Sequence, residues 1–279
     1  MKITALLRDR RMQQGAALLG LLTAVALLAP WIAPSDPLAQ HDVLRTRFLA
    51  PLVAGPDGIT HLLGTDRFGR DILSRLLYGA RISLAVGLLS VAVSLFIGVL
   101  VGSIAALAGG ATERALMALT DAALALPRLV LLLALVALWE PSLSLVVLVL
   151  GVTGWMPIAR LARAEVKGLL HRPFVEAART AGVSPARLLL RHLVPNAATP
   201  LLVAAVLGVG NAIGLEAGLS FLGLGVPPPA PSWGNMIAGG RDALVNAPWI
   251  AITPGLAVVI AVLACSLLAN GVTKALERN

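Results

Sequence analysis

The chain has 279 residues, of which 58% are hydrophobic and 13% are charged, and its mean hydropathy is +0.88. Soluble domains carry about 25% charged residues, so this composition excludes an ordinary soluble protein and indicates a membrane protein. The net charge of +8 does not indicate nucleic-acid binding, because the basic residues are scattered among apolar segments and an aromatic fraction of 4% leaves little surface for stacking bases.

Side chains that commonly hold metals are sparse. The lone cysteine, Cys265, lies within an apolar run, which excludes an intrachain disulfide and predicts a packing residue. The four histidines show none of the spacings typical of a metal site; they are His41, His61, His171 and His192. We therefore expect no metal and no resident cofactor.

Six segments are long and apolar enough to cross the membrane as helices, since ~20 apolar residues span the ~30 Å hydrocarbon layer. In chain order they are Gly15–Ala33, Ile82–Ala108, Ala115–Trp139, Pro141–Ala159, Ala197–Leu215 and Trp249–Asn270. The sequence therefore predicts an all-α polytopic membrane protein with six transmembrane helices.

The first segment follows a basic N-terminus, so a signal peptide is the alternative to a membrane anchor. Its 19 residues exceed the roughly 7–15 of a signal-peptide core, although Ala24-Val25-Ala26 faintly resembles a cleavage site. We interpret this segment as an uncleaved anchor helix outside a core of five spans.

The distribution of lysine and arginine predicts the orientation in the membrane. With a cytoplasmic N-terminus, 14 of the 22 basic residues lie inside. These are Lys2, Arg8, Arg10, Arg11, Arg114, Arg160, Arg163, Lys167, Arg172, Arg179, Arg187, Arg191, Lys274 and Arg278. The others are Arg128, within a span, and the outer residues Arg45, Arg47, Arg67, Arg70, Arg75, Arg81 and Arg241.

This orientation predicts a multi-pass protein with both termini in the cytoplasm. Residues 1–33 form the cytoplasmic N-terminus and the anchor, and residues 34–79 form an extracytoplasmic loop whose arginines are balanced by five aspartates. Residues 80–271 form the transmembrane domain, with a cytoplasmic loop at 160–196. Residues 272–279 form a cytoplasmic tail.

The cytoplasmic loop contains a polar, arginine-rich segment that reads EAARTAGVSPARLLLRHLVPN from Glu176 to Asn196. It predicts two short helices. Pro173 suits a first helical turn, and Gly182 can take the left-handed conformation that ends the first helix. Ser184-Pro185 then caps and opens the second helix, which Pro195 ends. Composition alone is equally consistent with an amphipathic helix pair on the lipid surface.

Five positions of this segment resemble the cytoplasmic "EAA" loop of the membrane-spanning subunits of ABC importers. They are Glu176, Ala177, Ala178, Gly182 and Pro195. In that family the loop docks into a groove on an ATPase subunit. The resemblance therefore implies the transmembrane domain of a type I ABC importer, driven by a separate ATPase.

A second stretch, His61–Leu84, reads HLLGTDRFGRDILSRLLYGARISL. Taken alone, it predicts a glycine-punctuated turn and an interfacial amphipathic helix. It is also similar to the G-T-D-x-x-G-R-D-x-x-S-R block of dipeptide, oligopeptide and nickel importer permeases, in the C-type subunit of the permease pair. The matching residues are Gly64, Thr65, Asp66, Gly69, Arg70, Asp71, Ser74 and Arg75.

A third stretch, Gly218–Ile237, reads GLSFLGLGVPPPAPSWGNMI. Its prolines and glycines predict an outer loop or re-entrant backbone rather than a helix. It resembles the S-F-L-G-L-G-V…P-S-W-G-N-M block of the same permeases. Two roles would explain so many glycines and prolines in this block: packing against another subunit or closure of an outer gate, or direct contact with the substrate. Near the C-terminus, Asn270 and Lys274 replace acidic residues of the relatives, which puts any salt bridge carried over from them in doubt.

Charged residues within the spans are candidates for the translocation path, because such residues usually face protein or water. Asp121 and Arg128 lie seven residues apart, which predicts one helical face, and Glu216 ends the fifth span. Arg128 could line the path and meet a peptide carboxylate. Alternatively, it pairs with Asp121, Glu140 or Glu216, or with a partner subunit.

These features predict a permease subunit that forms half of a peptide pathway across the cytoplasmic membrane, and not an enzyme. The chain has no G-x-x-x-x-G-K-[ST] loop, so ATP would be bound by partner subunits. The resemblance implies a second permease, two ATPase subunits and an extracytoplasmic binding protein. Within the transporter class, the alternatives are a nickel importer and an oligosaccharide importer. The sparse His, Cys and Met residues mildly disfavour nickel. In other classes, the alternatives are a passive channel and an intramembrane enzyme.

Overall fold

The computed structural model describes residues 9–40, 42–56 and 58–277. Several residues used above lie outside these ranges: the basic residues Lys2, Arg8 and Arg278, the histidine His41, and residues 278–279 of the predicted tail. The description below therefore concerns the membrane-spanning part and both of its ends, without the extreme termini.

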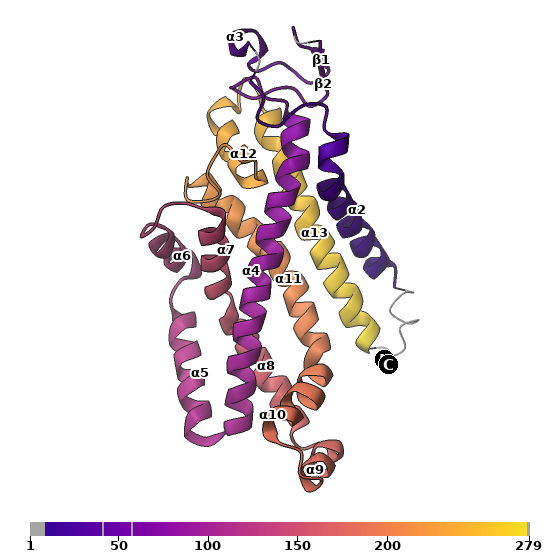
Figure 1. The fold of residues 1–279 in the computed structure, drawn as a ribbon, viewed down its shortest axis with the longest axis vertical. Helices are drawn as coiled ribbons and strands as arrows, with labels where there is room; N and C mark the ends of the chain where they lie inside the picture. The colour runs from indigo at the N-terminus through magenta and orange to yellow at the C-terminus, as the bar shows by residue number, and fades with distance from the viewer. Residues whose placement is uncertain (1–8, 41, 57, 278–279) are drawn as a thin grey trace.

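The molecule is an elongated bundle of helices (Figure 1). Four long helices run along its length: α2 (Arg10–Ile32), α4 (Ile72–Ala108), α11 (Val194–Phe221) and α13 (Trp249–Glu277). Shorter helices complete the bundle: α5 (Gly110–Ala125), α6 (Arg128–Val136), α7 (Leu143–Val152), α8 (Trp155–Leu169) and α12 (Trp233–Gly240), which a 3-10 turn (Arg241–Ala243) follows.

The two ends of the bundle differ in structure. One end carries α3 (Val43–Thr46) and a two-stranded antiparallel sheet. The sheet pairs β1 (Val53–Ala54) with β2 (Thr60–His61), with Val53 opposite His61. The opposite end carries α9 (Pro173–Thr180) and α10 (Pro185–Leu188), together with a π-helical turn (Leu189–Leu193).

Within the described ranges, four helices are long and apolar enough to cross a membrane, and the number rises to six if each of two bent helix pairs counts as one span. The prediction of an all-α polytopic fold is confirmed. Several predicted bounds differ from the structure, because hydropathy does not register polar residues at the ends of a helix. The second helix, α4, begins at Ile72 rather than Ile82, because the Asp71 carboxylate caps it by accepting from the Ser74 N–H at 2.7 Å.

The predicted third span is broken, so the expectation that Asp121 and Arg128 share one helical face is wrong. The helices α5 and α6 meet at an angle of 83°. Proline disfavours the helical conformation in the residue before it, and Leu126, which precedes Pro127, is extended with φ −77° and ψ 130°. The predicted fourth span is likewise bent by 41° between α7 and α8, and α8 continues to Leu169, ten residues beyond the predicted end.

Pro195 does not end the helix that precedes it, contrary to the prediction. The helix runs without interruption from Pro185 to Phe221. The π-helical turn lies just before Pro195, and in it the Val194 N–H donates to the Leu189 carbonyl. This wider turn gives the proline ring room that a regular α-helix would not offer. The predicted cap at Ser184 is also wrong in part, because its side chain makes no capping hydrogen bond.

Close helix packing in the lower half of the bundle depends on glycine. A Cβ atom on Gly102 of α4 would lie 2.8 Å from the Arg163 backbone nitrogen of α8 and would overlap the Ala159 carbonyl oxygen. Similarly, a Cβ atom on Gly98 would lie 2.7 Å from the Ile158 side chain. Small residues at helix contacts let membrane helices approach closely, where van der Waals packing replaces the hydrophobic effect.

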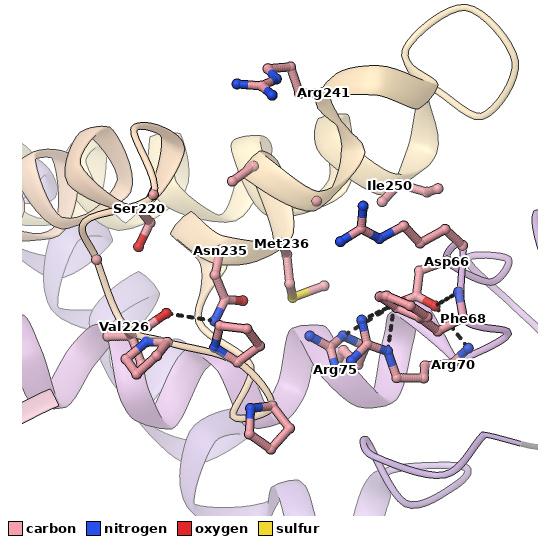
Figure 2. A pocket seen from close by; sticks show the side chains of 18 of the residues that line it. Asp66, Phe68, Arg70, Arg75, Ser220, Val226, Asn235, Met236, Arg241 and Ile250 are labelled. Atoms are coloured by element: carbon pink, nitrogen blue, oxygen red, sulfur yellow. Dashed lines mark hydrogen bonds and ion pairs between the residues drawn. The ribbon is translucent and has the colours of Figure 1, made fainter. Parts of the chain in front are cut away.

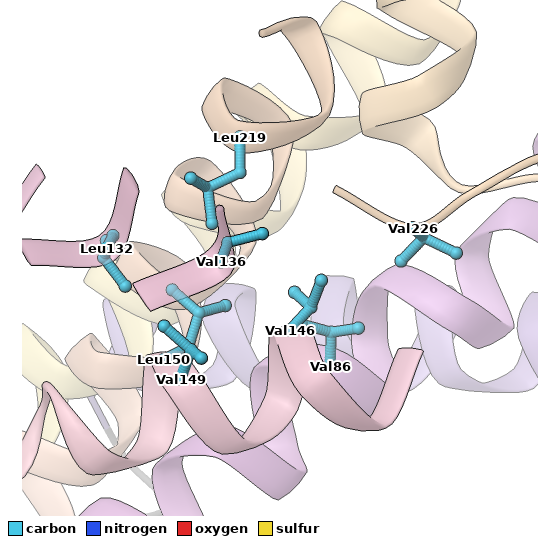
Figure 3. Packing of buried hydrophobic residues seen from close by; sticks show 8 residues of the cluster. All are labelled: Val86, Leu132, Val136, Val146, Val149, Leu150, Leu219 and Val226. Atoms are coloured by element: carbon cyan, nitrogen blue, oxygen red, sulfur yellow. The ribbon is translucent and has the colours of Figure 1, made fainter. Parts of the chain in front are cut away.

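The upper half of the bundle is held by an apolar cluster that joins four helices and a loop (Figure 3). Its buried members are Val86, Leu132, Val136, Val146, Val149, Leu150, Leu219 and Val226. This cluster fixes the bent α6–α7 unit against α4 and α11. On the other side of the bundle, α2 contacts α13 closely, because a Cβ atom on Gly271 would lie 2.5 Å from the Met12 backbone nitrogen.

We predict that Gly102→Leu separates α4 from α8 and destabilises the fold. Overpacking a tight contact costs about 1–3 kcal/mol, and more where backbone must move. The matched control is Gly168→Leu, since a Cβ atom on Gly168 of α8 meets no atom within 4 Å. We expect a lower unfolding temperature in detergent for Gly102→Leu alone, measured by tryptophan fluorescence. Equal unfolding temperatures for the two variants would contradict this account of the packing.

Candidate functional site

Asp66 organises the turn between β2 and α4. Its Oδ1 accepts from the backbone N–H groups of Phe68 (2.8 Å) and Arg70 (3.0 Å). Its Oδ2 accepts from the Arg70 Nε at 2.7 Å and lies 3.8 Å from the Arg75 Nε. The carboxylate is almost fully buried, so these charge-assisted contacts replace the water that it loses.

Asp71 and Thr65 connect the same turn to its surroundings. The Asp71 carboxylate lies 2.9 Å from the His61 Nδ1 in addition to capping α4. The Thr65 hydroxyl donates to the Thr46 carbonyl and accepts from the Leu49 N–H at 2.8 Å. These residues of the first motif block therefore fold the segment between α2 and α4 onto the start of α4.

The second motif block caps and seats α12. Ser232 and Asn235 form a capping box, in which each side chain accepts from the other residue's backbone N–H at 3.1 Å. The Asn235 amide also donates to the Val226 (3.2 Å) and Ala230 (2.7 Å) carbonyls, which closes the proline-rich loop. Trp233 donates from its backbone to the Ser83 hydroxyl of α4 at 3.0 Å.

The expectation that this block cannot be helical holds only for its middle. The helix α11 continues through Phe221, and Gly223 then takes φ +81°, which ends the helix. The chain becomes helical again at Trp233 because Ser232 supplies the cap. Within this chain, Ser232 and Asn235 cap α12 and close the proline-rich loop.

Glu216 ties the second block to α11. It is fully buried, and its Oε1 accepts from the Ser220 hydroxyl at 2.7 Å and the Ser232 hydroxyl at 2.9 Å. Its Oε2 makes no hydrogen bond to the residues that the structure describes. Glu216 therefore lies at the junction of α11 and α12, and not beside Arg128.

The two motif blocks, about 150 residues apart in the sequence, line one cavity of about 560 Å³ near the end of the bundle that carries α3 (Figures 1 and 2). The first block contributes the Asp66, Arg70 and Arg75 side chains. The second contributes Asn235 and Met236 of α12. Of the predicted residues of the first block, the structure brings Asp66, Arg70 and Arg75 to this cavity. The others do not line it: Gly64, Thr65, Gly69, Asp71 and Ser74.

At the opposite end, ion pairs fasten α5 to α8. The Glu113 carboxylate accepts from the Arg163 Nε at 2.6 Å and from the Lys167 Nζ at 2.7 Å. The Asp121 carboxylate accepts from the Arg160 Nε at 3.0 Å. Asp121 therefore pairs with a neighbouring helix and does not meet Arg128.

The segment that resembles an ATPase-docking loop is at this end as well, with α9 at the tip of the bundle (Figure 1). Val175 of α9 is fully buried in an apolar cluster with Ala106 of α4, Val166 of α8, Leu188 and Leu193. We call this cluster the α9 seat. Glu176 and Ala177 are exposed, and Ala178 is half-buried.

Gly182 ends α9 as predicted, with φ +76°, and a Cβ atom there would meet no atom within 4 Å. Its N–H donates to the Arg179 carbonyl at 2.9 Å, and the Val183 N–H donates to the Ala178 carbonyl at 3.1 Å. The glycine thus closes the helix and turns the chain toward α10. Pro195, the last residue of the motif, is exposed in the first turn of α11.

Comparisons with known proteins agree with this arrangement. The family described as "Binding-protein-dependent transport system inner membrane component" matches residues 98–279. The Di/tripeptide transport system permease protein DppC of Pseudomonas aeruginosa is 42% identical over 92% of this chain and 84% of that protein. The Dipeptide transport system permease protein DppC of Haemophilus influenzae is 37% identical over 95% of this chain and 91% of that protein.

The fold is similar to that of a solved transporter. An inward-facing crystal form of the MetNI methionine ABC transporter has a chain that superposes with a TM-score of 0.57, at 20% identity, over 72% of this chain and 97% of that one. The relatives are transport permeases and not enzymes. The several apolar helices and the family together identify a multi-pass membrane protein.

We predict that Ser232→Ala destabilises the outer end more than the loss of an ordinary helix cap. Loss of the cap costs about 0.5–2 kcal/mol, and the buried Glu216 Oε1 also loses a donor. The matched control is Ser142→Ala, since the half-buried Ser142 caps α7 by accepting from the Leu145 N–H at 3.1 Å, and its other side-chain hydrogen bond is to the exposed Ser144 hydroxyl. We expect faster proteolysis of the loop 222–232 in Ser232→Ala only. Identical proteolysis of both variants would refute the link through Glu216.

Proposed function

Because the chain belongs to the family of binding-protein-dependent transport system inner membrane components, we propose that it is a permease subunit that forms half of the pathway by which an ATP-driven importer takes up peptides. The observation that carries the peptide assignment is the 42% identity to a di/tripeptide permease over 92% of the chain. The outer cavity built from both motif blocks supports it, because such an opening is where a delivered substrate would enter.

The remaining subunits of the importer follow from the family. We infer a second permease that supplies the other half of the pathway, two ATPase subunits that bind the ATP, and an extracytoplasmic solute-binding protein. The α9 end of the bundle would face the cytoplasm. The basic residues near it, Arg160, Arg163 and Lys167, support this orientation, because cytoplasmic loops carry an excess of positive charge.

The α9 segment is the proposed contact with an ATPase. Its exposed face presents Glu176 and Ala177, and the short alanine side chain leaves that face narrow enough for a groove. Glu176 makes no side-chain hydrogen bond or ion pair among the described residues, which leaves its charge available to a partner.

Transmission of movement requires that α9 be fixed to the spans. The α9 seat supplies this, because Val175 is buried between the inner ends of α4 and α8. A displacement of α9 by the ATPase would therefore move α4 and α8 with it, as alternating access requires. The Glu113 ion pairs extend this coupling to α5.

We predict that Gly182→Val abolishes most peptide uptake while leaving the protein inserted. A β-branched residue at φ +76° is strained, and the left-handed conformation costs it about 1–2 kcal/mol. A cost of this size lowers the population of the native α9 conformation relative to an unstrained one roughly tenfold. The measurement is uptake of radiolabelled dialanine by cells whose own copy of the gene is deleted and replaced by each variant, with membrane levels checked by immunoblot.

The matched control is Gly20→Val, since a Cβ atom on Gly20 of α2 meets no atom within 4 Å. Wild type and Gly20→Val should restore uptake that collapses when ATP is depleted. No uptake from the wild-type gene would contradict the peptide assignment. Normal uptake by Gly182→Val would leave that assignment in place and contradict the proposed coupling through α9.

A further inference from the structure

A second cavity, of about 390 Å³, lies midway along the bundle between α4, α8 and α11. Its volume falls within the ~300–1,000 Å³ typical of sites for small ligands. The middle of α4 lines it, since Ser90 is both a lining residue and the central residue of that 37-residue helix. The polar side chains that line it are those of Ser90, Ser94, Arg128 and Asn211.

Arg128 brings an unpaired positive charge to this cavity. Among the described residues, no carboxylate forms an ion pair with it, and its one hydrogen bond is a long one from Nη2 to the Leu150 carbonyl at 3.3 Å. The Nε is buried without a partner. The candidate partners Asp121 and Glu216 are engaged elsewhere, as described above, and Glu140 forms no ion pair in the described chain. A guanidinium at this depth is costly without an anion.

Depth follows from the geometry of α5. Its 16 residues rise about 24 Å at 1.5 Å per residue before the chain turns at Pro127. Arg128 therefore lies well away from the end of the bundle at which α5 begins. The bend of 83° points α6 across the bundle, and Gly154 leaves room for the guanidinium, since a Cβ atom there would lie 3.1 Å from the Arg128 Nη2.

Two further polar residues line the same cavity. Ser90 is 1% exposed, and its hydroxyl has no hydrogen-bond partner among the described residues. Asn211 is exposed on α11, on the helical face that also carries Ala204, Leu207 and Gly208. An amide and a guanidinium facing lipid would both be unfavourable, so this opening faces the second permease and the water between the two subunits.

We propose that this cavity binds a carboxylate of the transported peptide, with the Arg128 guanidinium as the donor. This inference rests on the proposed function, because it names the step at which the permease itself holds the substrate. A carboxylate matches the paired N–H groups of a guanidinium. The site has few other polar groups, so binding stays weak enough for release, as passage through a membrane requires.

The test measures the charge of the cavity with thiol reagents, in the complex isolated in its native membranes. The variant Asn211→Cys is made in a Cys265→Ala background, which removes the lone native cysteine. Anionic sulfonatoethyl and cationic trimethylammonioethyl methanethiosulfonate are compared, each rate being normalised to that with a free thiol. We expect the anionic reagent to react roughly tenfold faster, because an unpaired cation lies nearby.

Further variants assign that selectivity to Arg128. Arg128→Gln should remove it and Arg128→Lys should keep it. The matched control is Arg160→Gln, which deletes an equal charge that is paired with Asp121 outside the cavity, and selectivity should persist in it. Dialanine at millimolar concentration should slow the labelling of Cys-substituted position 211, whereas dialanine amide, which lacks the carboxylate, should not.

Equal rates for the two reagents with Arg128 present would overturn the proposal, since they would mean that an acidic group of another subunit neutralises the cation. Equal protection by dialanine and its amide would also overturn it. Either result together with normal dialanine uptake leaves the permease assignment intact. If the labelling is charge-selective but cells show no uptake of dialanine through this chain, the result would support an anion site in the cavity and contradict a peptide as its ligand.

Discussion

The hydrocarbon layer offers no partner to a charge or a backbone polar group, and the whole chain is organised by that constraint. The carboxylates at the two ends of the bundle are satisfied by donors of the same chain: Asp66 by Arg70, and Glu113 by Arg163 and Lys167. In the interior, the Glu216 carboxylate accepts hydrogen bonds from two serine hydroxyls. Arg128 departs from this pattern, because no carboxylate among the described residues pairs with it and, unlike Glu216, it lines a cavity, where we propose that it meets the transported substrate.

One helix connects the three regions that matter for transport. One end of α4 is capped by Asp71 within the first motif block, its centre carries Ser90 at the cavity midway along the bundle, and its other end contributes Ala106 to the α9 seat. Close packing at Gly98 and Gly102 makes α8 move with it. A movement imposed at α9 therefore reaches the cavity and the outer cap through a single rigid element, which is the mechanical requirement of alternating access.

Hydropathy and motif spacing predicted the fold class and the left-handed Gly182, and the predicted six spans match the structure when each bent helix pair counts as one span. They failed where polar side chains extend a helix, as at Ser74 and Arg75 of α4. They also failed at two prolines whose effects differ: Pro127 breaks a helix, whereas the π-helical turn lets the helix continue through Pro195. The Ser232–Asn235 spacing carries a capping signal that local reading could have found. The Ser232–Glu216 and Arg160–Asp121 contacts could not be predicted, because they depend on how separate helices come together.

The central claim is that this chain receives its driving force through α9, and a site-specific crosslink within the purified assembly tests it most directly. The variant Ala178→Cys, with Cys265→Ala, is labelled with a short photoactivatable thiol crosslinker in native membranes, then purified in mild detergent and analysed by mass spectrometry. The account predicts a crosslink to an ATPase subunit, with a second permease in the same complex. A crosslinker that joins only lipid, or a chain that purifies alone in folded form, would contradict it.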